Sequence, residues 1–267
     1  MEAYAPPLTT RCCLCGSSES LSGEHKIKAS ALRSVFGDRK TVIIGDGGRF
    51  RYAQSSKSRA FHFAARVCEP CNSARTRPAD LAFDVFSCVA SELHSHGRDP
   101  TEAFQDPRFA PDMGHLYLDV FRYFAKLMCC HLAEMDAPYL EGIAEFAIGT
   151  NDHNVVTLMV DVDPAYQRIQ DDPQLRLYAA HGGLVITGDR TTKAPISFYS
   201  TLTIAAVRYR YFVSYNELGQ RELRDYYPDF YDWCVRRIAE MIDNPLDAEA
   251  RLRLGLPLDP EEPRPCP

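Results

Sequence analysis

The chain has 267 residues, of which 45% are hydrophobic and 25% charged, the composition of an ordinary globular protein rather than of a fibrous or disordered one. No stretch approaches the about 18–20 consecutive apolar residues of a membrane-spanning helix. The N-terminus also lacks the basic start and apolar run of a secretory signal. We therefore expect a cytoplasmic protein with reduced thiols and no membrane partner.

The net charge of −6 is unevenly distributed along the chain. Residues 1–80 carry 13 Lys and Arg against 7 Asp and Glu, which gives +6, whereas the remaining 187 residues carry −12. This asymmetry is expected if only the N-terminal part meets the phosphates of a nucleic acid. The alternative is the ordinary scatter of surface charges.

The N-terminal part is predicted to form short strands around one short helix. In the predicted helix Ala29–Phe36, Leu32 and Phe36 stand four residues apart, and Gly37 ends the helix. The predicted strands are residues 23–27, 41–44, 50–54 and 61–67. The last two alternate loosely between apolar and polar residues, and we expect them to pair as a hairpin across residues 55–59.

From residue 72 onward the pattern is helical, and it later changes to strands. An amphipathic helix is predicted over residues 79–94, with an apolar stripe formed by Leu81, Val85, Cys88, Val89 and Leu93. Further helices are predicted over residues 116–135, 139–148 and 221–242. The predicted strands are residues 155–162, 175–180, 183–187, 196–207 and 209–215. Their short connections indicate an antiparallel meander, so the fold class is α+β.

Ten cysteines are many for a cytosolic chain, and their spacing divides them into groups. Two C-x₂-C knuckles, Cys12 with Cys15 and Cys68 with Cys71, are separated by 52 residues. Four thiolates are the ligands of a structural zinc ion, in a closed site that leaves no open position for catalysis. The alternative is two unrelated cysteine pairs in a reduced core.

The other cysteines are assigned less directly. Cys13 could bind zinc only through a C-x-C spacing with Cys15, so Cys12 is preferred as the ligand. Four cysteines lie in apolar, helix-like segments and are expected to be small buried hydrophobic residues, namely Cys88, Cys129, Cys130 and Cys234. Cys266 lies in a proline-rich tail and is expected to be loose.

The order C-x₂-C, Glu-His, C-x₂-C-Asn resembles that of the zinc-stapled HNH, or His-Me finger, endonucleases. The matching segments are CCLCG with LSGEH and VCEPCNSARTRPAD, and they cover roughly residues 11–85. The resemblance implies that residues 1–97 form a zinc-stapled ββα-metal domain with an insertion. Residues 98–267 would then be a second α+β domain, with helices and an antiparallel sheet, for recognition, sensing or homo-oligomerisation.

The resemblance also implies catalytic roles. His25 matches the general base that removes a proton from the attacking water, and the ordinary pKa of imidazole suits this task. Glu24 and Asn72 match the ligands of a catalytic Mg²⁺ or Mn²⁺, since carboxylate and amide oxygens are hard ligands. The cation would stabilise the charge that develops on the scissile phosphate and the leaving oxygen.

The sequence departs from the family pattern in three respects. His62 is the candidate for the middle residue, with a catalytic or orienting role, but it lies six residues before Cys68. Glu24 is longer than the Asp of many members. The insertion, residues 33–66, is unusually long and could be a DNA-gripping hairpin or a regulatory flap. On the following helix, we expect Asp80 and Asp84 to pair with Arg77 or to cap the helix start, rather than to bind a metal.

Five basic residues flank the candidate catalytic residues and are expected to contact the phosphate backbone of DNA. They are Lys26, Lys28, Arg66, Arg75 and Arg77. The alternative for some of them is a solvated surface charge. Four tyrosines on the predicted strands could stack bases, but they are more typical of a core. They are Tyr199, Tyr209, Tyr211 and Tyr215.

Three hypotheses for the function follow. The first is a metal-dependent endonuclease that hydrolyses DNA phosphodiester bonds with His25 as the base, in phage defence or restriction by analogy with the family. The second is a non-catalytic zinc module that binds nucleic acid or protein, in which Glu24 and Asn72 are structural. The third is a small-molecule sensor with a vestigial nuclease fold and a pocket in the C-terminal sheet.

Overall fold

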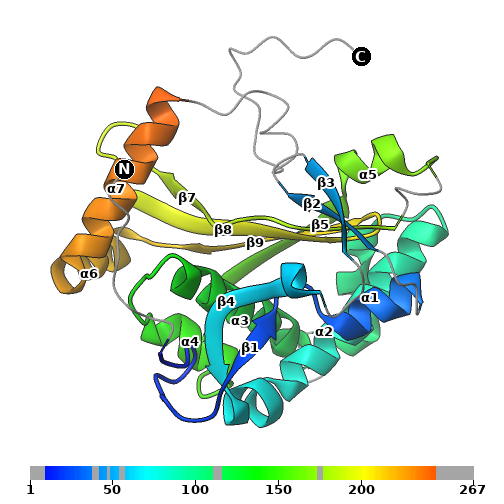
Figure 1. Ribbon diagram of the computed structural model, residues 1–267, viewed down its shortest axis with the longest axis horizontal. Coiled ribbons are helices and arrows are strands. Elements are labelled where there is room, and N and C mark those ends of the chain that lie inside the picture. The colour runs from blue at the N-terminus through cyan, green and yellow to red at the C-terminus, as the bar shows by residue number, and fades with distance from the viewer. Residues whose placement is uncertain are drawn as a thin grey trace.

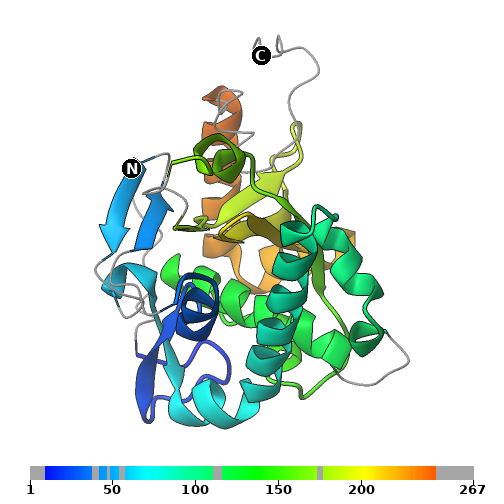
Figure 2. The same ribbon diagram turned by 90° about the vertical axis from the view of Figure 1, so that its right-hand side faces the viewer.

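The computed structural model describes residues 10–37, 42–46, 49–53, 58–110, 116–172 and 177–244. A seven-stranded sheet runs through the middle of the molecule, with helices on both sides of it (Figures 1 and 2). A separate two-stranded sheet lies below the large sheet in Figure 1. The molecule is therefore of the mixed α+β class, as the sequence predicts.

The two-stranded sheet joins segments that are far apart in the sequence. Its strands β1 (Leu21–His25) and β4 (His62–Cys68) run antiparallel, with Leu21 opposite Cys68 and His25 opposite His62. A 3₁₀ turn, η1 (Arg59–Phe61), leads into β4. Because the first knuckle precedes β1 and the second begins at the end of β4, the pairing brings both knuckles to the same end of the sheet.

The segment between the knuckles adds strands to the large sheet. After α1 (Ala29–Phe36), β2 (Val42–Asp46) and β3 (Arg49–Ala53) form a hairpin, and β2 pairs in parallel with β6 (Tyr178–His181). The prediction of a hairpin between residues 50–54 and 61–67 is wrong, because β3 pairs with β2 and β4 pairs with β1. Residue 54 lies outside the described residues. Alternation of residue type identifies a strand but not its partner.

Two long helices pack against each other below the large sheet in Figure 1. A π-helical turn, η2 (Cys71–Arg75), precedes α2 (Arg77–Ser95), which has Pro78 in its first turn, where a proline costs no hydrogen bond. The 3₁₀ turns η3 (Pro100–Gln105) and η4 (Pro107–Phe109) follow α2. The chain continues with α3 (Leu116–Glu134) and α4 (Glu141–Ala147), close to the predicted ranges.

The buried face of α2 differs from the predicted stripe. Leu81 is 53% exposed and Cys88 is also exposed, whereas Phe83 and Phe86 are fully buried. Phe83 stacks on Tyr123 of α3, with their ring centroids 4.0 Å apart. Two phenylalanines bury more apolar surface than Leu81 could, so the helix turns these rings toward the core.

The large sheet has the strand order β3-β2-β6-β8-β9-β5, with β7 also paired to β8. Its remaining strands are β5 (Val156–Val162), β7 (Val185–Gly188), β8 (Pro195–Ile204) and β9 (Val207–Ser214). The strands β7, β8 and β9 follow one another as the predicted meander, whereas β5 pairs with the far side of β9. Apart from the parallel pair β2–β6, every pairing in this sheet is antiparallel among the described residues.

The C-terminal part contains more helices than the sequence predicts. A short helix, α5 (Pro164–Ile169), follows β5 and is capped by the side chain of Asp163, which accepts a hydrogen bond from the amide of Ala165. The single helix expected over residues 221–242 is two helices, α6 (Glu217–Tyr226) and α7 (Pro228–Asp243). The chain breaks there because Pro228 cannot continue a helix and instead begins a new one.

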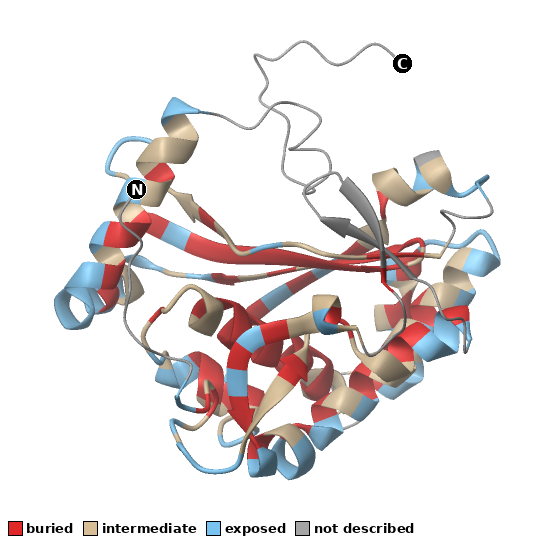
Figure 3. Ribbon diagram, viewed as in Figure 1, coloured by how far each residue is buried: buried red, intermediate tan, exposed pale blue. Residues whose placement is uncertain are grey.

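The core is centred on α3 and β8, which are buried along most of their length (Figure 3). Tyr199, Tyr209 and Tyr211 are buried in or beside this core, which supports the core interpretation of these rings rather than base stacking. None of the helices in the described residues combines the length and the apolar composition that a membrane span requires.

Residues of the two predicted domains, 1–97 and 98–267, share one hydrophobic core. The helix α2 of the first part packs on α3 of the second, and β2 of the first pairs with β6 of the second. Side-chain packing and sheet hydrogen bonds therefore join the two parts, and the boundary at residue 97 stays a prediction.

Candidate functional site

The first knuckle is a tight turn held by backbone hydrogen bonds. The amide of Gly16 donates to the carbonyl of Cys12 over 2.8 Å, and the amide of Cys12 donates to the carbonyl of Ser17 over 2.7 Å. Gly16 has a φ of 72°, a left-handed conformation that glycine adopts without strain. The amide of Cys13 donates to the carbonyl of Arg66 over 3.0 Å, which fastens the knuckle to β4.

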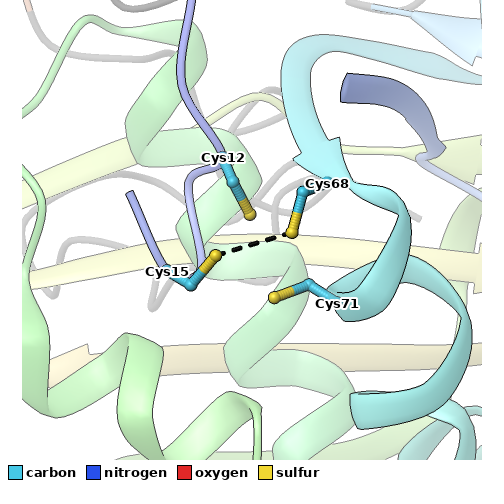
Figure 4. A group of neighbouring side chains, drawn as sticks. All are labelled: Cys12, Cys15, Cys68 and Cys71. Carbon is cyan, nitrogen blue, oxygen red and sulfur yellow. Dashed lines mark hydrogen bonds between the residues drawn. The ribbon is translucent and has the colours of Figure 1, made fainter. Parts of the chain in front are cut away.

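The second knuckle lies where β4 ends and the π-helical turn begins. The carbonyl of Cys71 accepts hydrogen bonds from both the amide and the hydroxyl group of Thr76, over 3.2 and 2.9 Å. Thr76 is fully buried. These bonds hold the backbone of Cys71 in place at the start of the turn, so that its thiol faces the sulfur atoms of the first knuckle (Figure 4).

Four sulfur atoms converge between the knuckles (Figure 4). The Sγ atoms of Cys12, Cys15, Cys68 and Cys71 all lie within 4.8 Å of one another. Within the described ranges this is the one group of three or more His, Cys, Asp or Glu side chains whose donor atoms could hold a metal ion. The hydrogen bond with Cys71 lowers the pKa of Cys12 below the usual range of a thiol, which favours the thiolate form that binds a metal. Four sulfurs this close fit tetrahedral zinc.

Cys13 does not join this group. Its sulfur lies 3.7 Å from the sulfur of Cys130 in α3, which agrees with the preference for Cys12 as the ligand. Three of the cysteines expected to be buried are buried, namely Cys129, Cys130 and Cys234. The expectation for Cys88 is wrong, because α2 turns its phenylalanines inward and leaves this residue exposed. Cys266 lies outside the described residues.

His25 and His62 meet at the end of the small sheet away from the knuckles. They are paired across β1 and β4, and their ring centroids lie 3.9 Å apart with the planes inclined by 42°. Burial, with smaller contributions from His62 and Lys126, lowers the pKa of His25 to about 4. The imidazole of His25 is therefore neutral at neutral pH and able to accept a proton.

The side chain of Glu24 points into the protein. The pairing of β1 with β4 is irregular between Gly23 and His25, and such a bulge redirects the side chain at its centre. Glu24 is buried, and its Oε1 lies 3.4 Å from the ammonium nitrogen of Lys126 in α3. Burial raises the pKa of Glu24, an effect that attraction to Lys126 partly offsets.

Asn72 ties the turn after the second knuckle to β1. Its Nδ2 donates to the hydroxyl oxygen of Ser22 over 3.0 Å and to the carbonyl of Gly23 over 3.3 Å. The hydroxyl of Ser22 in turn donates to the carbonyl of Val67 in β4 over 3.0 Å. Asn72 therefore connects both strands of the small sheet to the helical turn.

Glu24 and Asn72, the expected ligands of Mg²⁺ or Mn²⁺, both make contacts within the protein, and the cation site stays a prediction. The carboxylate of Glu24 is buried beside the ammonium group of Lys126, and Asn72 donates to β1 through Nδ2, which is not the atom that would bind a metal. A hard divalent cation needs accessible oxygen ligands and usually keeps several of its waters. The buried carboxylate of Glu24 does not offer such accessible oxygens.

The five basic residues fall into two groups. The ammonium of Lys26 pairs with Glu134 over 3.0 Å, and that of Lys28 pairs with Asp84 over 2.6 Å. The remaining three are exposed, namely Arg66, Arg75 and Arg77. Of the five basic residues, these three arginines are therefore the ones whose charged groups are accessible to solvent near the second knuckle.

Lys126 is the residue of this site that the sequence did not identify. Its ammonium nitrogen lies 2.6 Å from Oδ1 of Asp80. Asp80 thus pairs with Lys126, and Asp84 pairs with Lys28, whereas the expectation was that they pair with Arg77 or cap the helix start. A lysine in the middle of a strongly apolar helix is the signal that could have revealed it, because lysine is rarely buried without a partner.

No known protein family, curated protein or solved structure matches the chain. The likeness to zinc-stapled HNH endonucleases therefore rests on the motif residues themselves. Around them the chain supplies two paired strands, a helix and a cluster of four cysteines that could hold a metal ion such as zinc.

Proposed function

We propose that the protein is an endonuclease of the zinc-stapled HNH type, which hydrolyses DNA phosphodiester bonds at His25. The observation that carries the proposal is the half-buried imidazole of His25, which lies beside His62 with the ring centroids 3.9 Å apart, at the end of the paired strands β1 and β4. A neutral imidazole can take a proton from an attacking water. The succession of two paired strands and a helix around the four cysteines supports the same assignment.

In this proposal His25 removes a proton from a water molecule while the water oxygen attacks phosphorus. The bond from phosphorus to the leaving oxygen breaks, and that oxygen takes a proton from solvent, which leaves a phosphomonoester and a hydroxyl group. His62 orients His25 and disfavours its protonation, because two adjacent imidazoles resist a shared positive charge. The exposed Arg66, Arg75 and Arg77 contact the DNA backbone. Zinc held by the cysteines would supply folding free energy and no chemistry.

A plasmid-nicking assay tests the proposal. Zinc-loaded wild type and His25→Ala are compared with added Mg²⁺, with added Mn²⁺ and with no added divalent cation. We expect wild type to nick DNA. We expect His25→Ala to nick it at least about 100-fold more slowly, because a general base contributes at least about that factor to the rate. DNA binding, measured by gel shift, should be unchanged. The exposed His96 provides the control, and His96→Ala should retain activity.

A second function is favoured by the contacts of Glu24 and Asn72. Both side chains are used within the protein, as they would be in a non-catalytic zinc module that binds nucleic acid or protein. In that case zinc-loaded wild type binds DNA but cleaves none under any of the three conditions. This result would contradict the nuclease proposal.

A further inference from the structure

Three charged side chains from three elements meet in the interior. The ammonium nitrogen of Lys126 lies 2.6 Å from Oδ1 of Asp80 and 3.4 Å from Oε1 of Glu24. The side chains of Lys126, Glu24 and Asp80 are 1%, 10% and 18% exposed. Since Glu24 belongs to β1, Asp80 to α2 and Lys126 to α3, the contacts join the small sheet to both long helices.

The charge of Lys126 is maintained by its two partners. An ammonium group in the interior is stable only when it is paired. Burial lowers the pKa of Lys126, but attraction to Glu24 and Asp80 outweighs it and raises the pKa above its usual value. Lys126 is therefore charged at neutral pH, and it serves as the counter-ion of Glu24.

A second ammonium group, that of Lys28, contacts the backbone of Asp80. Lys28 donates to the backbone carbonyl of Asp80 and to Oδ2 of Asp84, each over 2.6 Å. The hydroxyl of Ser30 donates to the other oxygen of Asp84 over 3.1 Å. The carboxylates of Glu24, Asp80 and Asp84 thus each have a partner supplied by the protein itself.

The position of Lys126 matters because Glu24 is the residue that the motif assigns to the divalent cation. A cation at Glu24 would lie beside a fixed ammonium group that repels it. It would also have to give up its waters in a buried site, which Mg²⁺ does reluctantly. The positive charge beside this carboxylate is that of Lys126, which Glu24 shares with Asp80.

We propose that the ammonium group of Lys126 occupies the position that Mg²⁺ or Mn²⁺ would need at Glu24, and that Glu24 therefore binds no divalent cation. Lys126 is a positioning residue that holds β1, and with it His25, against α2 and α3. If the protein is the nuclease proposed above, it follows that His25 acts without a cation at Glu24; this consequence rests on the proposed function.

Mn²⁺ binding to the full, zinc-loaded chain tests this inference. Electron paramagnetic resonance of free Mn²⁺ gives the number of bound ions in wild type and in Glu24→Gln. The matched control is Glu19→Gln, which removes an exposed carboxylate. We expect the three proteins to bind Mn²⁺ alike. Loss of a bound ion in Glu24→Gln but not in Glu19→Gln would overturn the inference.

A second variant keeps the inference testable if Glu24→Gln does not fold. Lys126→Met removes the ammonium group and keeps an unbranched side chain. We expect this variant to bind one Mn²⁺ ion more than wild type, because Glu24 and Asp80 lose the ammonium group that they share. A folded Lys126→Met that binds no more Mn²⁺ than wild type would also overturn the inference. Neither Mn²⁺ measurement depends on DNA cleavage. A negative nicking assay would therefore contradict the proposed function without deciding whether Glu24 binds a cation.

Discussion

Neighbouring cysteines in the first knuckle have different surroundings although they are chemically identical. The sulfur of Cys12 belongs to the four-thiol group and accepts a hydrogen bond from the amide of Leu14 over 3.4 Å. The sulfur of Cys13 instead lies against Cys130 in α3. Successive side chains of the turn point in different directions, so only one of the two can reach the second knuckle.

This difference predicts opposite results for two serine variants. We expect Cys12→Ser to lose most of its zinc and to lower the free energy of unfolding by about 4 kcal/mol or more, the size associated with loss of a structural metal. Cys13→Ser should keep its zinc, because its sulfur is not a ligand. Zinc content by mass spectrometry and denaturant unfolding measure both. Equal zinc loss in the two variants would show that Cys13 contributes to the site.

At the scale of elements, β7 is closely covered by α7. Gly188 lies where the register of β7 with β8 shifts. A Cβ at this position would lie 2.5 Å from Cδ1 of Ile238 in α7 and 2.9 Å from the backbone carbonyl of Ala194. The absence of a side chain at Gly188 therefore allows the helix to approach the strand.

We expect Gly188→Ala to lower the free energy of unfolding by about 1–3 kcal/mol, because the carbonyl of Ala194 cannot move aside as a side chain could. Gly183→Ala is the matched control, since no heavy atom lies within 4 Å of a Cβ built there. Its effect should stay within about 0.5 kcal/mol. Urea unfolding of both variants measures the difference, and equal midpoints would contradict the observed packing of α7.

At the scale of the whole molecule, the small sheet, α3 and the large sheet meet at a pair of histidines. The rings of His131 in α3 and His181 in β6 stack with centroids 4.6 Å apart, and Phe63 of β4 contacts His131 edge-on at 5.0 Å. Nε2 of His131 lies 3.0 Å from the hydroxyl oxygens of Ser200 and Tyr211. Among the described residues, Nε2 of His181 is buried without a hydrogen-bond partner. Both imidazoles are thus held in the neutral form.

This pair makes stability depend on pH. Burial lowers the pKa of His181 to about 3 and lowers that of His131 as well, whereas both titrate near about 6.5 in the unfolded chain. Between these values the unfolded chain binds more protons, so the free energy of unfolding falls as the pH is lowered from about 6.5 toward 3. We expect the decrease to be smaller in His181→Gln and unchanged in the exposed control His96→Gln. Denaturant unfolding at pH 7 and pH 4.5 measures the decrease in the free energy of unfolding. Identical decreases in wild type, His181→Gln and His96→Gln would show that His181 is not its cause.

Much of the local structure and the cysteine cluster could be predicted from the sequence. The helix Ala29–Phe36 and the ligand set of the two knuckles depend on residue spacing within short segments. Local rules govern such features, because a C-x₂-C turn or a helical repeat fixes the direction of its side chains over a few residues. The mixed α+β class follows in the same way from the periodicity of successive segments.

Only the tertiary structure decided which segments meet. The pairing of β1 with β4 brought His62 to His25, and the packing of α3 supplied Lys126 to Glu24. Within the insertion, β2 and β3 form a hairpin that joins the large sheet through the pairing of β2 with β6. The sequence by itself thus determined the candidate zinc ligands, whereas the counter-ion of Glu24 was decided by contacts between distant segments, because no local pattern encodes which buried charges will face each other.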